Sequence, residues 1–127
     1  MSRRTTLIAG LLVTAVPMTT VLADEVRMTD AEIVAALTGN SVHGMWGETE
    51  YYSYFNASGA TIYTTKRGSD LGTWRAKGDQ YCSVWARSGE SCYTLLRDGD
   101  KIIWVVPDSG KRYESLLIEG KPAATFQ

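Results

Sequence analysis

From Ser41 onward, short runs of β-branched and aromatic residues alternate with turn-forming residues. Connections of only a few residues join antiparallel neighbours, so this pattern predicts a meander of strands. The predicted strands are Val42–Trp46, Thr49–Phe55, Ala60–Lys66, Leu71–Lys77, Gln80–Ala86, Ser91–Arg97, Lys101–Val106 and Lys111–Glu119. A meander of this length must close on itself or fold into two layers. We therefore expect a mostly β domain, a small antiparallel barrel of seven or eight strands, with a β-sandwich as the alternative.

One short helix is expected before the strands. The sequence Thr29-Asp30-Ala31-Glu32 has the spacing of a capping box, which marks the start of a helix. Gly39 is placed to end the helix in the left-handed conformation, so we expect it to span Asp30–Thr38. A helix this short is not stable alone. Ile33, Val34 and Leu37 supply its apolar side, so the helix must dock on another part of the protein.

Residues 1–23 have the composition of an export leader. Arg3 and Arg4 precede the uncharged, mostly apolar run Leu7–Met18, and small residues follow as far as Ala23. This order is typical of a secretory signal peptide. The run is shorter than the roughly 20 residues that span a bilayer. We expect cleavage near Ala23 and a periplasmic or secreted single domain, residues 24–127, without a membrane span.

The leader leaves the export route open. Ser2-Arg3-Arg4-Thr5-Thr6-Leu7 also matches part of a twin-arginine signal. The aromatic residue usual in such signals is absent at Thr6. The general route carries unfolded chains, whereas the twin-arginine route carries folded ones.

The two cysteines, Cys82 and Cys92, are expected to form a disulfide. An exported chain meets oxidising conditions, and two cysteines can pair in only one way. A redox-active pair is the alternative, but the spacing lacks the C-x-x-C geometry that lowers a thiol pKa. Because so small a domain is marginally stable, we expect the bond to contribute about 2–3 kcal/mol.

The disulfide would fix the strand register between Gln80 and Val106, provided that Asp98-Gly99 forms a two-residue turn. Successive side chains then alternate between two faces. One face would carry Cys82, Val84, Cys92, Thr94, Leu96, Ile103 and Val105, and the other Tyr81, Trp85, Tyr93, Leu95, Ile102 and Trp104. Tyr93 and Trp104 would be cross-strand partners. Neither face is polar, although an antiparallel sheet usually keeps one wet face.

Both apolar faces need cover. One would become the barrel interior, and the other would be covered by the helix, by a partner or by a ligand. The helix and the core together could cover both apolar faces without any partner or ligand. The functional interpretation is a binding surface made by Tyr81, Trp85, Tyr93 and Trp104, since Trp and Tyr dominate interface energetics. The partner would be an unknown protein or a small apolar ligand.

Signs of catalysis, metal binding and nucleic-acid binding are weak. His43 is the single histidine, and no G-x-S-x-G motif or Cys/His metal cluster occurs. Asp98-Gly99-Asp100 lacks the rest of a calcium loop, and Glu48 and Glu50 fit a solvated strand edge better than a carboxylate pair. The 13 basic residues form no block. We expect no catalytic residue, metal, cofactor or nucleic acid, with an enzyme centred on His43 as a third hypothesis.

A series of short motifs resembles one group of proteins. In order, the motifs are Leu37-Thr38-Gly39-Asn40-Ser41-Val42-His43-Gly44, the aromatic strand Tyr51–Phe55, Gly72-Thr73-Trp74, Gly78-Asp79-Gln80-Tyr81-Cys82 and Cys92-Tyr93. The series is similar to short exported bacterial proteins known only as domains of unknown function. Ala57-Ser58-Gly59 departs from that group, where an Asp-Gly turn is more typical. The resemblance implies export, the disulfide and a β fold, but no activity.

A second resemblance concerns one loop. Ser109-Gly110-Lys111-Arg112-Tyr113 fits the pattern S-G-x-x-Y. It is similar to a loop that bacterial periplasmic lysozyme inhibitors, themselves small β-barrels, insert into the lysozyme cleft. The resemblance implies that Ser109 inserts and that Tyr113 supports it.

The leading hypothesis is therefore an exported, non-enzymatic binding or interaction protein of the periplasm or cell envelope, which uses its aromatic sheet face. The doubly apolar sheet and the missing catalytic constellation favour it. The alternative is an inhibitor of a lysozyme-type cell-wall hydrolase, acting through the Ser109–Tyr113 loop.

Overall fold

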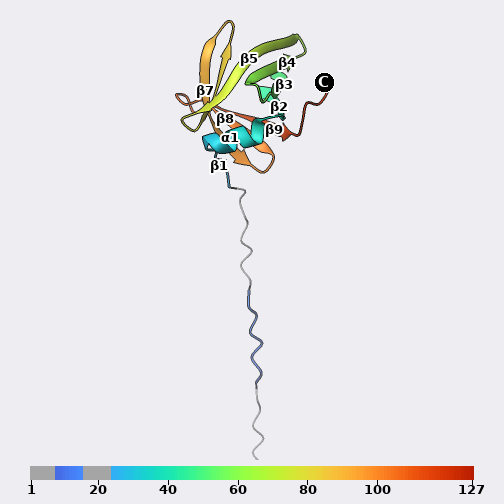
Figure 1. The fold of residues 1–127 in the computed structure, drawn as a ribbon. Coiled ribbons are helices and arrows are strands. Elements are labelled where there is room, and N and C mark those ends of the chain that lie inside the picture. Colours follow the sequence, from blue (N-terminus) through green and yellow to red (C-terminus); the bar gives the residue numbers. More distant parts are fainter. Residues whose placement is uncertain (1–7, 16–23) are drawn as a thin grey trace, which may run out of the picture.

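The computed structural model describes residues 8–15 and 24–127. Residues 8–15 contain no helix or strand, and the expected cleavage at Ala23 lies outside the described residues. Within the described ranges, no helix is long and apolar enough to cross a bilayer. Residues 24–127 fold into a barrel with one helix across its lower end (Figure 1).

Eight strands close the barrel, as the turn pattern predicts. In chain order the elements are β1 (Val26–Arg27), α1 (Asp30–Leu37), β2 (Ser41–Trp46), β3 (Thr49–Phe55), β4 (Ala60–Thr65), β5 (Gly68–Lys77), β6 (Gln80–Trp85), β7 (Gly89–Asp98), β8 (Lys101–Val105) and β9 (Arg112–Ile118). From β2 to β9 each strand pairs with the next in antiparallel fashion, and β9 pairs back to β2. The barrel is therefore confirmed over the sandwich.

Strand β1 is the one strand that the sequence pattern does not predict. It pairs with the part of β7 beyond β6, with Val26 opposite Arg97, and the Met28 N–H extends the pairing to the Leu95 carbonyl at 2.9 Å. A two-residue strand is too short to show a hydrophobic period.

Helix α1 has the expected caps. The hydroxyl of Thr29 accepts the Glu32 N–H while the Glu32 carboxylate accepts the Thr29 N–H, and Gly39 follows with φ +76°. A second contact ties the helix to the turn between β5 and β6. The Asp30 N–H donates to the Asp79 carboxylate at 2.9 Å, and the Asp79 N–H donates to the Asp30 carboxylate at 2.8 Å. This exchange holds the start of the helix at one end of the barrel.

The helix closes that end by entering the core. Ile33 and Leu37 are fully buried and belong to the same cluster as Phe55 and Leu95 from the barrel walls. Val34, expected on the apolar side, is instead 46% exposed. The apolar side of α1 therefore covers one end of the barrel interior. The sequence had also allowed it to cover the outer face of the sheet.

The predicted division of the sheet into two faces is confirmed, but one turn is wrong. Asp98 pairs with Lys101, so the turn residues are Gly99-Asp100 rather than Asp98-Gly99, and Trp104 lies opposite Leu95 instead of Tyr93. Gly99 has φ +59°, as the first central position of a type II′ turn requires. The pairing shifts by two residues, which keeps every side chain on its predicted face.

The disulfide is present and lies on the outer face. Cys82 and Cys92 are directly opposite each other on β6 and β7, and their sulfurs are bonded. On the same face Ile103 is buried, whereas Val84 is 41% exposed. The outer apolar face is thus only partly covered.

Candidate functional site

The two ends of the barrel differ because hairpins turn at alternate ends of a meander. The β5–β6 turn lies at the end that α1 closes, through its contact with Asp30. The β2–β3, β4–β5, β6–β7 and β8–β9 turns therefore lie at the opposite end. No helix covers this second end within residues 24–127.

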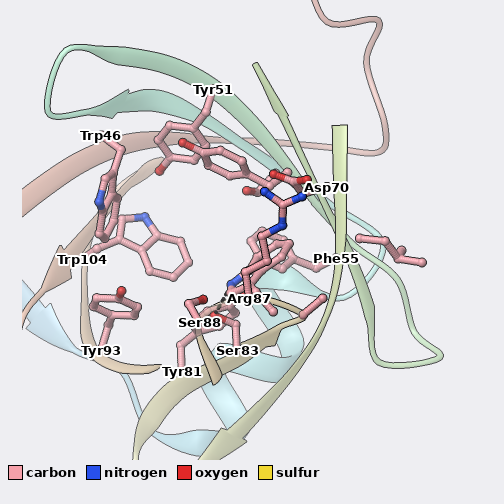
Figure 2. Close-up of a pocket in the computed structure, with 15 residues that line it drawn as sticks. Trp46, Tyr51, Phe55, Asp70, Tyr81, Ser83, Arg87, Ser88, Tyr93 and Trp104 are labelled. Atoms are coloured by element: carbon pink, nitrogen blue, oxygen red, sulfur yellow. Dashed lines mark hydrogen bonds between the residues drawn. The ribbon is translucent and has the colours of Figure 1, made fainter. Parts of the chain in front are cut away.

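A cavity of about 490 Å³ occupies the barrel interior on this open side. Its lining is mostly aromatic, with a few small and polar residues near the rim. The lining residues are Trp46, Tyr51, Ser53, Phe55, Tyr63, Asp70, Leu71, Tyr81, Ser83, Trp85, Ala86, Arg87, Ser88, Tyr93 and Trp104. Figure 2 shows side chains projecting from all around the wall toward a common hollow. A volume of this size is typical of small-molecule sites.

The four residues predicted to form a binding face all line this cavity. Tyr81 and Trp104 are buried, with ring centroids 4.8 Å apart and planes at 88°. Trp85 and Tyr93 are half-buried. The structure brings the four together inside the barrel rather than on an external surface, because closure of the sheet turns this face inward.

Four further rings of the cavity, Trp46, Tyr51, Phe55 and Tyr63, come from strands outside the stretch whose register the sequence fixes. The planes of Trp46 and Tyr51 meet at 80°, and those of Trp46 and Tyr93 at 81° with centroids 5.3 Å apart. Tyr63 stacks on Tyr51 at 5.1 Å. Their alternate positions along the predicted strands were a usable signal. Without a fixed register, however, the sequence does not show which alternate set points inward.

Glycine at position 72 makes room for one wall of the cavity. Gly72 is paired with Trp85, and a Cβ at this position would lie 2.6 Å from the indole ring. Any larger residue would have to displace the ring. The Trp85 indole N–H donates to the Ser83 hydroxyl at 3.1 Å, which fixes the ring from the other side.

Hydrogen bonds also hold the floor of the cavity. The Trp104 indole N–H donates to the Ser115 hydroxyl at 2.9 Å, and that hydroxyl donates to the Ile102 carbonyl at 3.0 Å. Among the described residues, no buried side-chain nitrogen or oxygen atom lacks a partner. The indoles of Trp85 and Trp104 are therefore held in place before any ligand enters.

The hydroxyls of Tyr51, Tyr63 and Tyr81 stay neutral at physiological pH. Burial raises the pKa of Tyr51 and Tyr81, because the phenolate would lose its hydration. Burial also raises the pKa of Tyr63, with a smaller contribution from the nearby Asp70 carboxylate. These groups offer uncharged hydroxyls and electron-rich ring faces.

The charged groups of the lining are Asp70 on β5 and Arg87 in the β6–β7 turn. Both are exposed at the rim, and no ion pair joins them in the described part of the chain. Ser88 adds a hydroxyl beside Arg87. The rim can therefore receive a ligand that carries charge of either sign.

A separate polar group lies on the outer wall. The imidazole of His43 is 3.0 Å from the Glu50 carboxylate and stacks on Tyr52 at 4.2 Å. The His43 side chain is 31% exposed beside a shallow groove. Among residues 24–127, no serine, threonine or cysteine side chain is hydrogen-bonded to it. The pair of His43 and Glu50 therefore has an acid and a base but no nucleophile. Glu48 lies apart from this pair, exposed in the β2–β3 turn.

Potential metal ligands gather at one place in the described chain. Cys82, Cys92 and Glu90 lie close enough to share an ion. Both sulfurs are used by the disulfide, and the Glu90 carboxylate accepts a 2.7 Å hydrogen bond from Arg75. The oxidised protein therefore offers no chelating set there.

The loop compared with lysozyme inhibitors lies at the open end. Ser109 is exposed in the β8–β9 turn, where its hydroxyl accepts the Lys111 N–H at 3.2 Å. Tyr113 stacks on Trp46, with centroids 4.0 Å apart. Ser109 is thus accessible, while Tyr113 is engaged with the rim of the barrel.

No protein-family model, curated protein or solved structure matches this chain. The two resemblances drawn from the sequence therefore stay predictions, and so does export. Function is inferred from the cavity itself.

Proposed function

We propose that this chain is an exported, non-enzymatic binding protein that holds a small molecule inside its barrel. The ligand enters at the open end and places its apolar surface against Tyr81, Trp85, Tyr93 and Trp104. The protein acts in the periplasm or at the cell envelope, as the composition of residues 1–23 favours.

The cavity is the observation that carries this proposal. Four of its eight rings, Trp46, Tyr63, Trp85 and Tyr93, are partly exposed around about 490 Å³ of space. Half-exposed Trp and Tyr side chains give up their contact with water readily when a ligand covers them. Because hydrogen bonds already hold Trp85 and Trp104, binding need not order them first.

The test is titration with an uncharged apolar fluorescent probe such as N-phenyl-1-naphthylamine. We expect saturable binding of one probe per chain and quenching of tryptophan emission. Trp85→Ala should weaken binding about tenfold, and Tyr52→Ala on the outer wall should leave it unchanged. The proposal fails if binding does not saturate, or if both variants bind the probe as the parent does.

A second candidate function is inhibition of a lysozyme-type cell-wall hydrolase. The exposure of Ser109 in a turn at the open end favours it. A lysozyme assay with the purified protein decides the matter. Inhibition that Ser109→Ala abolishes would support this function, and no inhibition at micromolar protein would remove it.

A further inference from the structure

We propose that the ligand of the cavity is a betaine, a molecule in which a trimethylammonium group and a carboxylate are joined by a short chain. This inference rests on the proposed function and names the chemical class of its ligand. Three properties of the cavity lead to it: the type of apolar side chain, the angles between rings, and the charges at the rim.

The cavity wall is aromatic rather than aliphatic. Eight of the lining residues are aromatic and seven of these are Trp or Tyr, whereas Leu71 and Ala86 are the aliphatic members. An alkyl chain gains as much from Leu or Val as from an aromatic ring. Electron-rich ring faces, by contrast, attract a desolvated cation, and recognition of methylated ammonium groups uses this attraction.

The rings form a box rather than a slot. Trp46 stands at 80° to Tyr51 and at 81° to Tyr93, and Tyr93 stands at 82° to Trp104. Walls at right angles suit a rounded group that touches several rings at once, and a trimethylammonium group has that shape.

The charges of the lining call for a ligand with two poles. In Figure 2 the rings of Trp46, Tyr93 and Trp104 lie on one side of the hollow, and Asp70 and Arg87 lie on the other. Because Asp70 and Arg87 lie on the same side, each would repel a ligand group of its own sign. The Arg87 guanidinium can bind a carboxylate through two parallel hydrogen bonds, so we place the carboxylate of the ligand there and its cation among the rings.

Titration calorimetry on the disulfide-bonded protein tests the charge requirement with three probes of similar size. Glycine betaine carries both charges, 3,3-dimethylbutanoate replaces the ammonium nitrogen by carbon, and choline lacks the carboxylate. We expect glycine betaine to bind at least about tenfold more tightly than 3,3-dimethylbutanoate, because the isostere loses the cation–π attraction. Equal affinities for these two, or no binding of glycine betaine, would overturn the inference.

Variants test the assigned residues. Tyr93→Leu keeps the apolar character of the wall but removes a ring face, so the preference for glycine betaine over its isostere should fall about tenfold. Tyr52→Leu, on the outer wall, is the matched control. Arg87→Gln, at an exposed position, should weaken glycine betaine about tenfold and leave choline no weaker. An unchanged preference in Tyr93→Leu, or equal weakening of both ligands by Arg87→Gln, contradicts the assignment.

Failure of this inference is distinguishable from failure of the proposed function. If N-phenyl-1-naphthylamine binds in the barrel but glycine betaine does not, the cavity is a ligand site for another class of molecule. If neither binds, both proposals are lost.

Discussion

The two ends of the barrel are built from the same strands, yet they are in opposite states. At the end closed by α1, Ile33 and Leu37 fill the space between the walls and leave no exposed core surface. At the other end Trp85 and Tyr93 stay half-exposed around a cavity. One eight-residue helix accounts for the difference.

The comparison separates stability from function. Burial at the closed end is complete, so each side chain there contributes its full transfer free energy. Rings at the open end keep part of their contact with water, so a ligand that covers them gains the remaining transfer free energy. We expect substitutions at the closed end to act on folding, and those at the open end to act on binding.

The largest effect is expected at the closed end. Leu37→Ala removes a fully buried side chain and should lower the free energy of unfolding by about 2–5 kcal/mol. Val34→Ala on the exposed side of the same helix is the control and should change it by no more than about 0.5 kcal/mol. Denaturant unfolding measures both. Equal effects would show that α1 does not seal the core.

Loss of the disulfide should come next. Cys82→Ser combined with Cys92→Ser frees a loop of sequence separation 10, and we expect a loss of about 2–3 kcal/mol in unfolding free energy. The bond joins β6 to β7, whose connecting turn carries Arg87 at the rim. Ligand affinity should therefore fall in the folded variant too. A melting temperature unchanged by reduction would rule out a stabilising role.

At the open end, truncation of a larger side chain should lower the free energy of unfolding by a smaller amount. Trp85→Ala removes more atoms than Leu37→Ala, but from a half-exposed ring, so we expect a loss of only about 1–2 kcal/mol. The same variant should lose most of its probe binding. If Trp85→Ala destabilises the protein more than Leu37→Ala does, the two ends do not divide stability and function as described.

The smallest effect concerns the outer wall, away from both ends. The hydrogen bond with His43 and a second from the Gln127 N–H hold the pKa of Glu50 below its ordinary value of 4.5. A depressed carboxyl pKa stabilises the folded form above the ordinary value, and this contribution disappears as pH falls through the lowered pKa. The C-terminal tail, residues 121–127, should therefore detach from Glu50 in acid, while the barrel stays closed.

Nuclear magnetic resonance follows this detachment directly. Phe126 packs edge-on against Tyr52, so its ring signals should move toward solvent-exposed values as Glu50 is protonated. Glu50→Gln should show exposed values already at neutral pH if the charge of the carboxylate holds the tail. A tail that is unaffected by both changes does not depend on Glu50.

Local chemistry made much of the fold predictable. The capping box at Thr29 and the glycine at position 39 give the helix its ends, because caps depend on neighbouring residues alone. The pairing of Cys82 with Cys92 fixed the faces of β6 and β7, and the short turn at Gly99 extended the assignment to β8. The turn was placed at Asp98-Gly99 instead of Gly99-Asp100 because glycine suits two positions. It is favoured at the second central position of a type I′ turn and at the first central position of a type II′ turn.

The candidate site was predictable only in part. Tyr81, Trp85 and Tyr93 were identified because the disulfide ties β6 to β7, and Trp104 because a short turn joins β7 to β8. The walls contributed by β2, β3 and β4, and the rim charges Asp70 and Arg87, were missed. Nothing local fixes the register of those strands relative to the disulfide hairpin, so their side chains could not be assigned to a face.

The sequence by itself determined that β6, β7 and β8 carry apolar side chains on both faces, since alternation along a strand is a local property. Only the tertiary structure decided which face became the interior. That choice depends on the curvature of the whole closed sheet and on where α1 docks, and both arise from contacts between residues far apart in the chain. The aromatic face identified from the sequence therefore lines a cavity, and this cavity opens to solvent at the open end of the barrel.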